Sequence, residues 1–111
     1  MNNNSVVKVV YNTCFGGFNL SKEATDMYEK LSGKTLERYG DWADIGGISR
    51  SDPALVHVVE TLGDAAGGAH SRLAITTVPE GSFYRIDEYD GRESVETKDT
   101  YEWTLATNSP T

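Results

Sequence analysis

The Phe-Gly-Gly-Phe stretch at residues 15–18 combines residue types and spacing that could do chemistry. A glycine turn that leads into a helix can expose backbone N–H groups to a phosphate or a carboxylate. Glycine can equally serve geometry, because it accepts positive φ and lets two segments approach closely. Gly16 and Gly17 lack the other glycines of a dinucleotide-binding turn. We therefore favour a bend between a strand and a helix, with anion binding as the alternative.

A second candidate site lies in a predicted β-hairpin in the last third of the chain. Asp90 and the glycine after it indicate a two-residue turn, in which both residues need positive φ. This register places Glu88 directly opposite Glu93, and opposed like charges are unfavourable unless a cation compensates them. Arg50 and Arg38 are the candidates for that cation. The two glutamates could act in acid–base chemistry or bind a cation, or both could be solvated at an exposed tip.

The potential metal ligands and nucleophiles of the chain do not form a set. Cys14, His57 and His70 show no paired spacing of the kind that zinc sites use. No histidine is near Cys14 in the sequence, and a small buried cysteine is the commoner case. We therefore expect no metal and no cofactor and identify no catalytic residues, which favours a protein that is not an enzyme.

The charge of the chain is concentrated in its last third. The 111 residues carry a net charge of −7, and residues 80–102 hold eight acidic against three basic residues, which accounts for −5. The acidic residues are Glu80, Asp87, Glu88, Asp90, Glu93, Glu96, Asp99 and Glu102. Such a surface would repel nucleic acid, so no direct nucleic-acid binding is expected, and it would attract a protein with a basic surface.

Length and cysteine content bound the class of protein. One globular domain over residues 1–111 is expected, with disordered ends at about 1–4 and 107–111. The single cysteine excludes an intramolecular disulfide and favours a reducing compartment. The sequence shows no signal peptide and no run long enough to span a membrane. We therefore expect an intracellular, cytoplasmic protein that is not secreted and has no membrane partner.

Two amphipathic helices are predicted. The first follows an N-cap at Ser21 and stops at Gly33. The second begins with Asp52 as the cap and Pro53 in the first helical position, and a glycine pair at 67–68 ends it. The apolar stripe of the second helix consists of Leu55, Val58, Val59, Leu62, Ala65 and Ala66. A stripe at this spacing indicates a helix that packs on the core.

Strands are predicted before and after the helices. The strand segments are residues 6–11, 73–78, 83–89, 92–98 and 101–105, the last of which could pair with a second copy in a homodimer. Residues 34–50 are predicted to form an ordered loop. Trp42 in this loop and Trp103 near the end could anchor a partner or cover the core. The order predicts an α+β, two-layer domain, with a mostly antiparallel sheet of about four strands and a C-terminal hairpin, covered on one face by two helices.

Four motifs in this order resemble a family of small uncharacterised proteins of bacteriophages and large DNA viruses. They are CFGGFNLSKEA, SDPALVHVVETLGDAAGG, LAITTVP and YRIDEYDGRE. The family shares an aromatic-Gly-Gly-Phe-x-Leu-Ser start, a helix with Asp-Pro-x-Leu-Val-x-Val-Val-Glu-x-Leu-Gly, and a Glu-Tyr-Asp-Gly hairpin tip. The resemblance covers roughly residues 6–95. It implies a viral origin and an accessory protein that acts on host machinery or on the virion.

The leading hypothesis is a non-catalytic viral accessory protein. It would bind a host or virion protein through its acidic surface, for instance as an inhibitor of host defence or of host nucleic-acid machinery, and would be cytoplasmic or virion-associated. One alternative is a small anion- or nucleotide-binding protein or enzyme that uses the glycine turn and the hairpin carboxylates. A structural virion component is the other. The candidate binding residues are Gly16, Gly17, Trp42, Arg50, Glu88, Asp90, Glu93 and Trp103.

Overall fold

The computed structural model describes residues 5–40, 42–45 and 47–97. The elements in chain order are β1 (Val6–Asn12), β2 (Asn19–Ser21), α1 (Lys22–Ser32), β3 (Arg38–Tyr39), β4 (Trp42–Asp44), α2 (Pro53–Leu62), the 3-10 helix η1 (Gly63–Ala66), β5 (Leu73–Pro79), β6 (Tyr84–Tyr89) and β7 (Arg92–Thr97). Every strand pairing among these residues is antiparallel, which confirms the predicted α+β class. The strands divide into three units, β1–β5, β2–β4–β3 and β6–β7.

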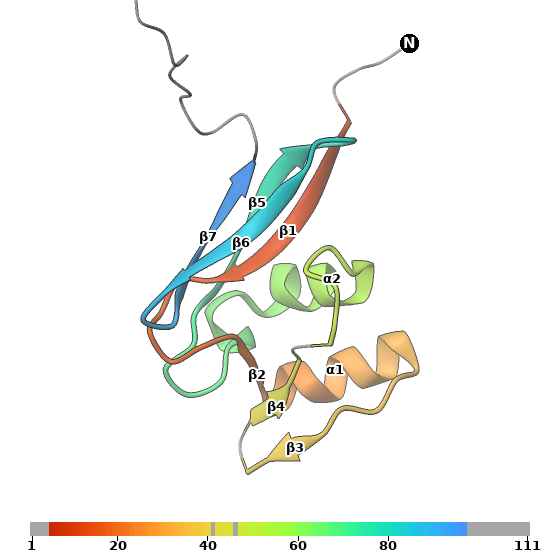
Figure 1. Cartoon of the computed structure of the whole chain (residues 1–111). Coiled ribbons are helices and arrows are strands. Elements are labelled where there is room, and N and C mark those ends of the chain that lie inside the picture. Colours follow the sequence, from red (N-terminus) through yellow and green to blue (C-terminus); the bar gives the residue numbers. More distant parts are fainter. Residues whose placement is uncertain (1–4, 41, 46, 98–111) are drawn as a thin grey trace, which may run out of the picture.

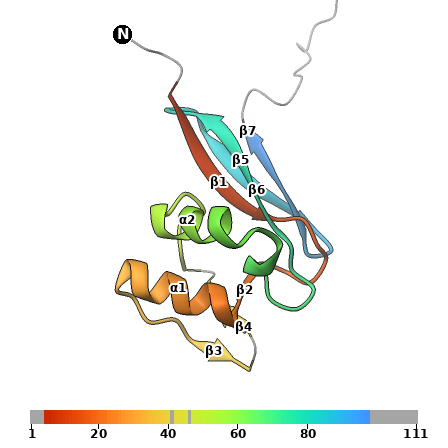
Figure 2. The same cartoon turned by 180° about the vertical axis from the view of Figure 1, so that it is seen from behind.

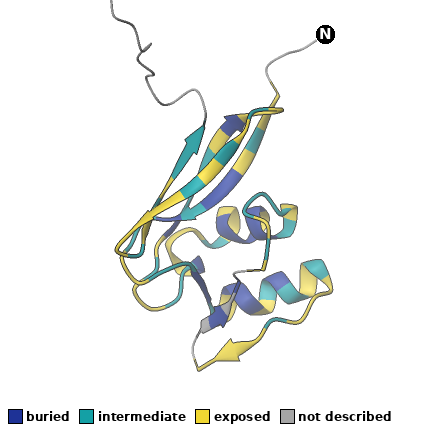
Figure 3. Ribbon diagram, viewed as in Figure 1, coloured by how far each residue is buried: buried dark blue, intermediate teal, exposed yellow. Residues whose placement is uncertain are grey.

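The β1–β5 pair forms the middle of the molecule, and both of its faces are covered. Val10 lies opposite Ile75; Val10 belongs to the core that the helices share, and the partly buried Ile75 packs against that core. Val9, one residue earlier, points to the other face and is also fully buried. Figures 1 and 2 show α2 on the first side of this pair and the β6–β7 hairpin across the second. Figure 3 shows the buried residues gathered where these layers meet.

Helix α1 forms an outer layer against α2 and the small β2–β4–β3 sheet. Its predicted ends are confirmed. The Ser21 hydroxyl accepts a hydrogen bond from the backbone N–H of Ala24 at 3.1 Å, and Gly33 ends the helix at φ +74°. Tyr28 of α1 is fully buried against the core. Leu20, Ile45, Leu55 and Val58 are fully buried members of the same core cluster.

Helix α2 starts as predicted and ends earlier. The Asp52 carboxylate accepts the N–H of Ala54 at 2.8 Å, and Pro53 occupies the first turn. The α-helix stops at Leu62 because Gly63 takes φ +57°, and one turn of 3-10 helix follows. Beyond that point the predicted stripe is wrong for Ala65, which is exposed, and right for Ala66, which is fully buried in the core.

The segment predicted as a loop contains two short strands. β4 lies between β2 and β3 and includes Trp42. β2, which was not predicted, separates the glycine pair from α1. Trp103, the predicted strand at 101–105 and the predicted disordered ends lie outside the described residues.

Candidate functional site

The hairpin has the predicted register. Asp90 and Gly91 both take positive φ, +53° and +85°, and Glu88 lies opposite Glu93. The two glutamates nevertheless have different surroundings. Glu88 is exposed, whereas the Glu93 side chain is only 6% exposed. The hairpin thus presents one of the two carboxylates and buries the other, so the expectation that both are solvated is wrong for Glu93.

Glu93 is neutralised by Arg50, one of the two predicted partners. The guanidinium binds both carboxylate oxygens, Nη1 to Oε1 at 2.6 Å and Nη2 to Oε2 at 2.9 Å. The same guanidinium lies 3.5 Å from the centre of the Phe18 ring. The backbone N–H of Asn12 donates a further hydrogen bond to Oε1 at 2.9 Å. This arrangement ties the hairpin to the body of the protein.

Arg38 does not reach the hairpin. It pairs with Asp26 and Glu29 of α1, at 2.7 Å in each case. The backbone N–H of Leu36, followed by Arg38, holds the pKa of Glu29 below its usual 4.5. These contacts attach the segment after α1 to the helix.

Asn12 links three segments at the hairpin end of the molecule. Its fully buried amide donates to the carbonyl oxygens of Cys14 and Gly91, the latter at 2.8 Å. Its side-chain oxygen accepts from the N–H of Arg72 at 2.9 Å and the hydroxyl of Ser71 at 3.2 Å. This residue was not among those predicted from the sequence. The available signal was an asparagine at the end of a valine-rich strand, since asparagine is depleted in strands.

Gly16 and Gly17 have a structural role at the hairpin end of the molecule. The N–H of Gly16 donates to the carbonyl of His70 at 2.7 Å, so it is not free to bind an anion. A Cβ at Gly16 would overlap that carbonyl, and Gly17 takes φ +92°. The predicted bend is therefore present. It leads into β2, however, and not directly into the helix that Ser21 caps.

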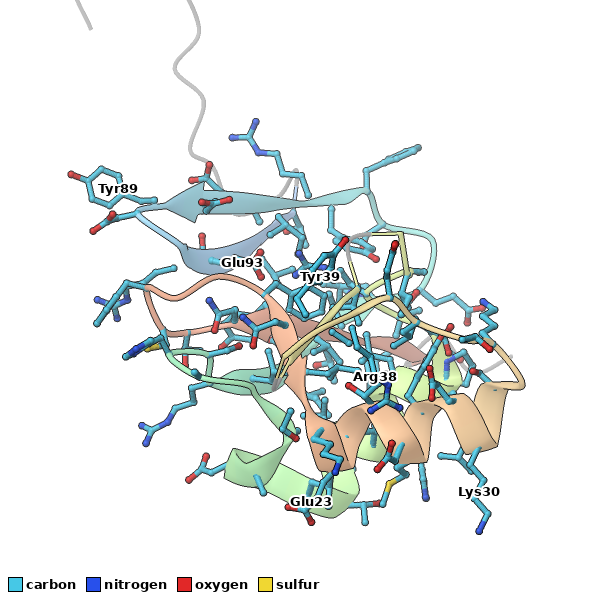
Figure 4. All side chains as sticks on the ribbon, turned by 90° about the horizontal axis from the view of Figure 1, so that it is seen from below. Glu23, Lys30, Arg38, Tyr39, Tyr89 and Glu93 are labelled. Carbon is cyan, nitrogen blue, oxygen red and sulfur yellow. The ribbon has the colours of Figure 1, made fainter. Side chains whose placement is uncertain are left out.

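Exposed rings gather at the same end. Figure 4 shows Tyr89 projecting from the end of the hairpin while Glu93 points inward. Tyr89 is 85% exposed and Phe15 is 65% exposed. The Phe15 ring stacks on His70, with 6.2 Å between ring centres and 22° between planes. His70 itself has φ +61°, which is uncommon for a residue other than glycine.

Within the described residues, the acidic side chains of the last third do not form one continuous surface, and Asp99 and Glu102 lie outside those residues. Three exposed carboxylates, those of Asp87, Glu88 and Asp90, lie next to Tyr89 along the chain at the tip. Asp87 shares the strand face of Tyr89, and Glu88 lies on the opposite face. Glu80 lies at the other end of the hairpin, as the chain path in Figure 1 shows. A hollow of about 260 Å³ at the tip is lined by Asp87, Tyr89, Arg92, Glu93 and Ser94.

A second hollow, of about 520 Å³, lies between the end of α1 and the start of α2. It is lined by Leu31, Ser32, Lys34, Asp52, Pro53, Ala54 and His57. The Asp52 carboxylate in this hollow is already hydrogen-bonded, because it caps α2 and accepts a hydrogen bond from the Tyr28 hydroxyl at 3.0 Å. Burial, and then the bond to Asp52, raise the pKa of Tyr28 above its usual 10.0.

Within the described residues, no group of three or more His, Cys, Asp or Glu is placed to hold a metal ion. In the same part of the chain no helix is long and apolar enough to cross a membrane. No protein-family model, curated protein or solved structure matches this chain.

Proposed function

We propose that this chain is a non-catalytic protein that binds a partner with a basic surface through the tip of its β6–β7 hairpin. The observation that carries the proposal is the set of three exposed carboxylates, Asp87, Glu88 and Asp90, at the hairpin tip that also carries Tyr89. None of Asp87, Glu88 and Asp90 forms an ion pair with another described residue. With Arg92 across the strand from Tyr89, the tip has a net charge of −2. A field of this sign steers a cationic partner toward it.

The way in which the hairpin tip is attached to the body of the protein favours binding over catalysis. The buried Arg50–Glu93 pair and the Asn12 hydrogen bonds hold the hairpin against the body. A surface held in one geometry loses less conformational entropy when a partner binds. The two features that could have served chemistry are already engaged, because Arg50 neutralises Glu93 and the His70 carbonyl occupies the Gly16 N–H.

The biological setting comes from the motif resemblance. A viral accessory protein of this kind would bind a host or virion protein in the infected cell. Carboxylates on a rigid hairpin could occupy a groove that normally accepts the phosphates of a nucleic acid. Such a protein would inhibit the host machinery without binding nucleic acid directly.

Affinity capture tests the proposal. The tagged chain is used as bait in host lysate at low and at moderate salt, beside an Asp87→Asn/Glu88→Gln/Asp90→Asn variant. Asparagine tolerates the positive φ of position 90, so the turn is retained. A matched variant, Glu23→Gln/Glu37→Gln/Glu80→Gln, removes three exposed carboxylates elsewhere. We expect a partner that the first variant loses and the second retains. Equal capture by both variants, or no partner at either salt concentration, contradicts the proposal.

A further inference from the structure

We propose that the exposed rings beside the hairpin tip make this surface selective for arginine over lysine in the partner. The inference rests on the proposed function and adds the chemistry of the recognised group. A guanidinium of the partner would stack on Phe15 or Tyr89 and pair with the tip carboxylates. The partner is thus a protein segment that carries arginine.

The rings and the tip form one surface because their backbones touch. Gly91 packs so closely on the backbone of Phe15 that a Cβ at position 91 would overlap the Phe15 carbonyl. The Asn12 side chain bonds to the carbonyls on both sides of this contact, those of Cys14 and Gly91. Figures 1 and 2 both show the loop after β1 lying against the end of the hairpin. The Phe15 backbone and the hairpin tip are therefore joined by direct contact and by the Asn12 side chain.

Both rings are exposed to solvent, and the Phe15 ring also stacks on another side chain of the protein. Tyr89 and Phe15 are 85% and 65% exposed. His70 stacks on Phe15, and the Gly16 N–H bond to the His70 carbonyl positions the histidine. One face of the Phe15 ring is thus supported within the chain, and the ring as a whole remains open to a partner.

One contact inside the chain already has the geometry proposed for the partner's arginine. Arg50 lies over the Phe18 ring at 3.5 Å while both of its terminal nitrogens bind Glu93. A planar guanidinium satisfies a ring and a carboxylate together, whereas a lysine ammonium offers a compact and strongly hydrated charge. The tip presents the same two components, rings and carboxylates, to solvent. A guanidinium from outside can therefore be held in the same way.

Two synthetic peptides test the inference with the whole chain. They share a Gly/Ser-spaced sequence and differ only in carrying arginines or lysines, and titration calorimetry or fluorescence anisotropy gives their dissociation constants. Exposed cation–π contacts are worth a factor of about 2–5 in affinity per ring. We expect the arginine peptide to bind more tightly than its lysine twin by about that factor, and both peptides to weaken as salt is raised.

Leucine substitutions separate the rings from the charges. Phe15→Leu/Tyr89→Leu keeps an apolar surface and removes both π systems, so it should abolish the preference for arginine and weaken the lysine peptide less than the arginine peptide. The Asp87→Asn/Glu88→Gln/Asp90→Asn variant should instead weaken both peptides. Both variants change exposed side chains, and an unchanged melting temperature verifies that they fold.

Equal affinity for the two peptides, or a preference that survives loss of both rings, overturns the inference. Those outcomes leave the proposed function standing, because a surface that attracts cations without discriminating between them still binds a basic partner. The proposed function fails on a different result: the host partner is captured equally well when the tip carboxylates are removed.

Discussion

Removal of Glu93 is the sharpest test of how the hairpin is held. Glu93→Ala deletes both carboxylate acceptors of the Arg50 guanidinium and the acceptor of the Asn12 N–H, and among the described residues leaves the guanidinium only the Val10 carbonyl as an acceptor, at 3.4 Å. The Arg50 side chain is only 20% exposed, so its charge would be left largely buried without a counter-charge. Breaking a buried ion pair from one side costs about 3–5 kcal/mol. With about 2.1 cal/mol/K of unfolding entropy per residue, the melting temperature should fall by roughly 13–21 °C.

A double-mutant cycle isolates the ion pair from the loss of packing. The variants are Glu93→Leu, Arg50→Met and the double mutant, and urea unfolding followed by circular dichroism gives each free energy of unfolding. The double mutant leaves no uncompensated charge. It should therefore lose less stability than the sum of the single variants, by at least about 1 kcal/mol. Hydrogen exchange should rise in β6 and β7 of the single variants before it rises in α2.

Two results would refute this reasoning. One is a loss of less than about 1 kcal/mol in Glu93→Ala, the range of an ordinary exposed pair. The other is additivity of the two single variants within about 0.5 kcal/mol, the limit expected of independent sites. Either would show that the packing of the hairpin on β1–β5, and not the ion pair, holds it in place.

Three further predictions follow from local geometry. Gly16→Ala should cost about 1–3 kcal/mol in urea unfolding, because its Cβ overlaps the carbonyl of His70. The pKa of Glu29 is held below 4.5, so its contribution to stability is present above pH 4.5 and is lost as the pH falls through the folded-state pKa; Arg38→Ala should raise that pKa in an NMR titration. The pKa of Tyr28 is raised above 10.0, so its contribution is present below pH 10.0 and is lost as the pH rises; Tyr28→Phe should flatten the alkaline fall in stability.

Elements with local signals could be predicted from the sequence. The Ser21 and Asp52 caps, the Gly33 stop and the turn at Asp90 depend on residues within one turn of one another. The turn then sets the whole hairpin register, because each strand residue can pair with only one partner once the loop is closed. The α+β class followed from the order of these elements.

Elements built by distant contacts could not be predicted in this way. β2, β3 and β4 have only two or three residues each, too few for a periodic pattern, and they exist because they pair with one another. Helix α2 was predicted too long because one glycine inside an apolar stripe is compatible with a continuous helix. Only the conformation of Gly63 shows that it is not.

The sequence alone determined which residues the hairpin carries and which of them face each other, since both follow from a two-residue turn and a period of two. Only the tertiary structure decided that Glu93 is neutralised while Glu88 remains in solvent. That difference depends on Arg50, 43 positions away along the chain, and on the stacking of the hairpin over β1–β5. Burial and charge compensation are properties of the packed layers. A local sequence pattern contains no information about them.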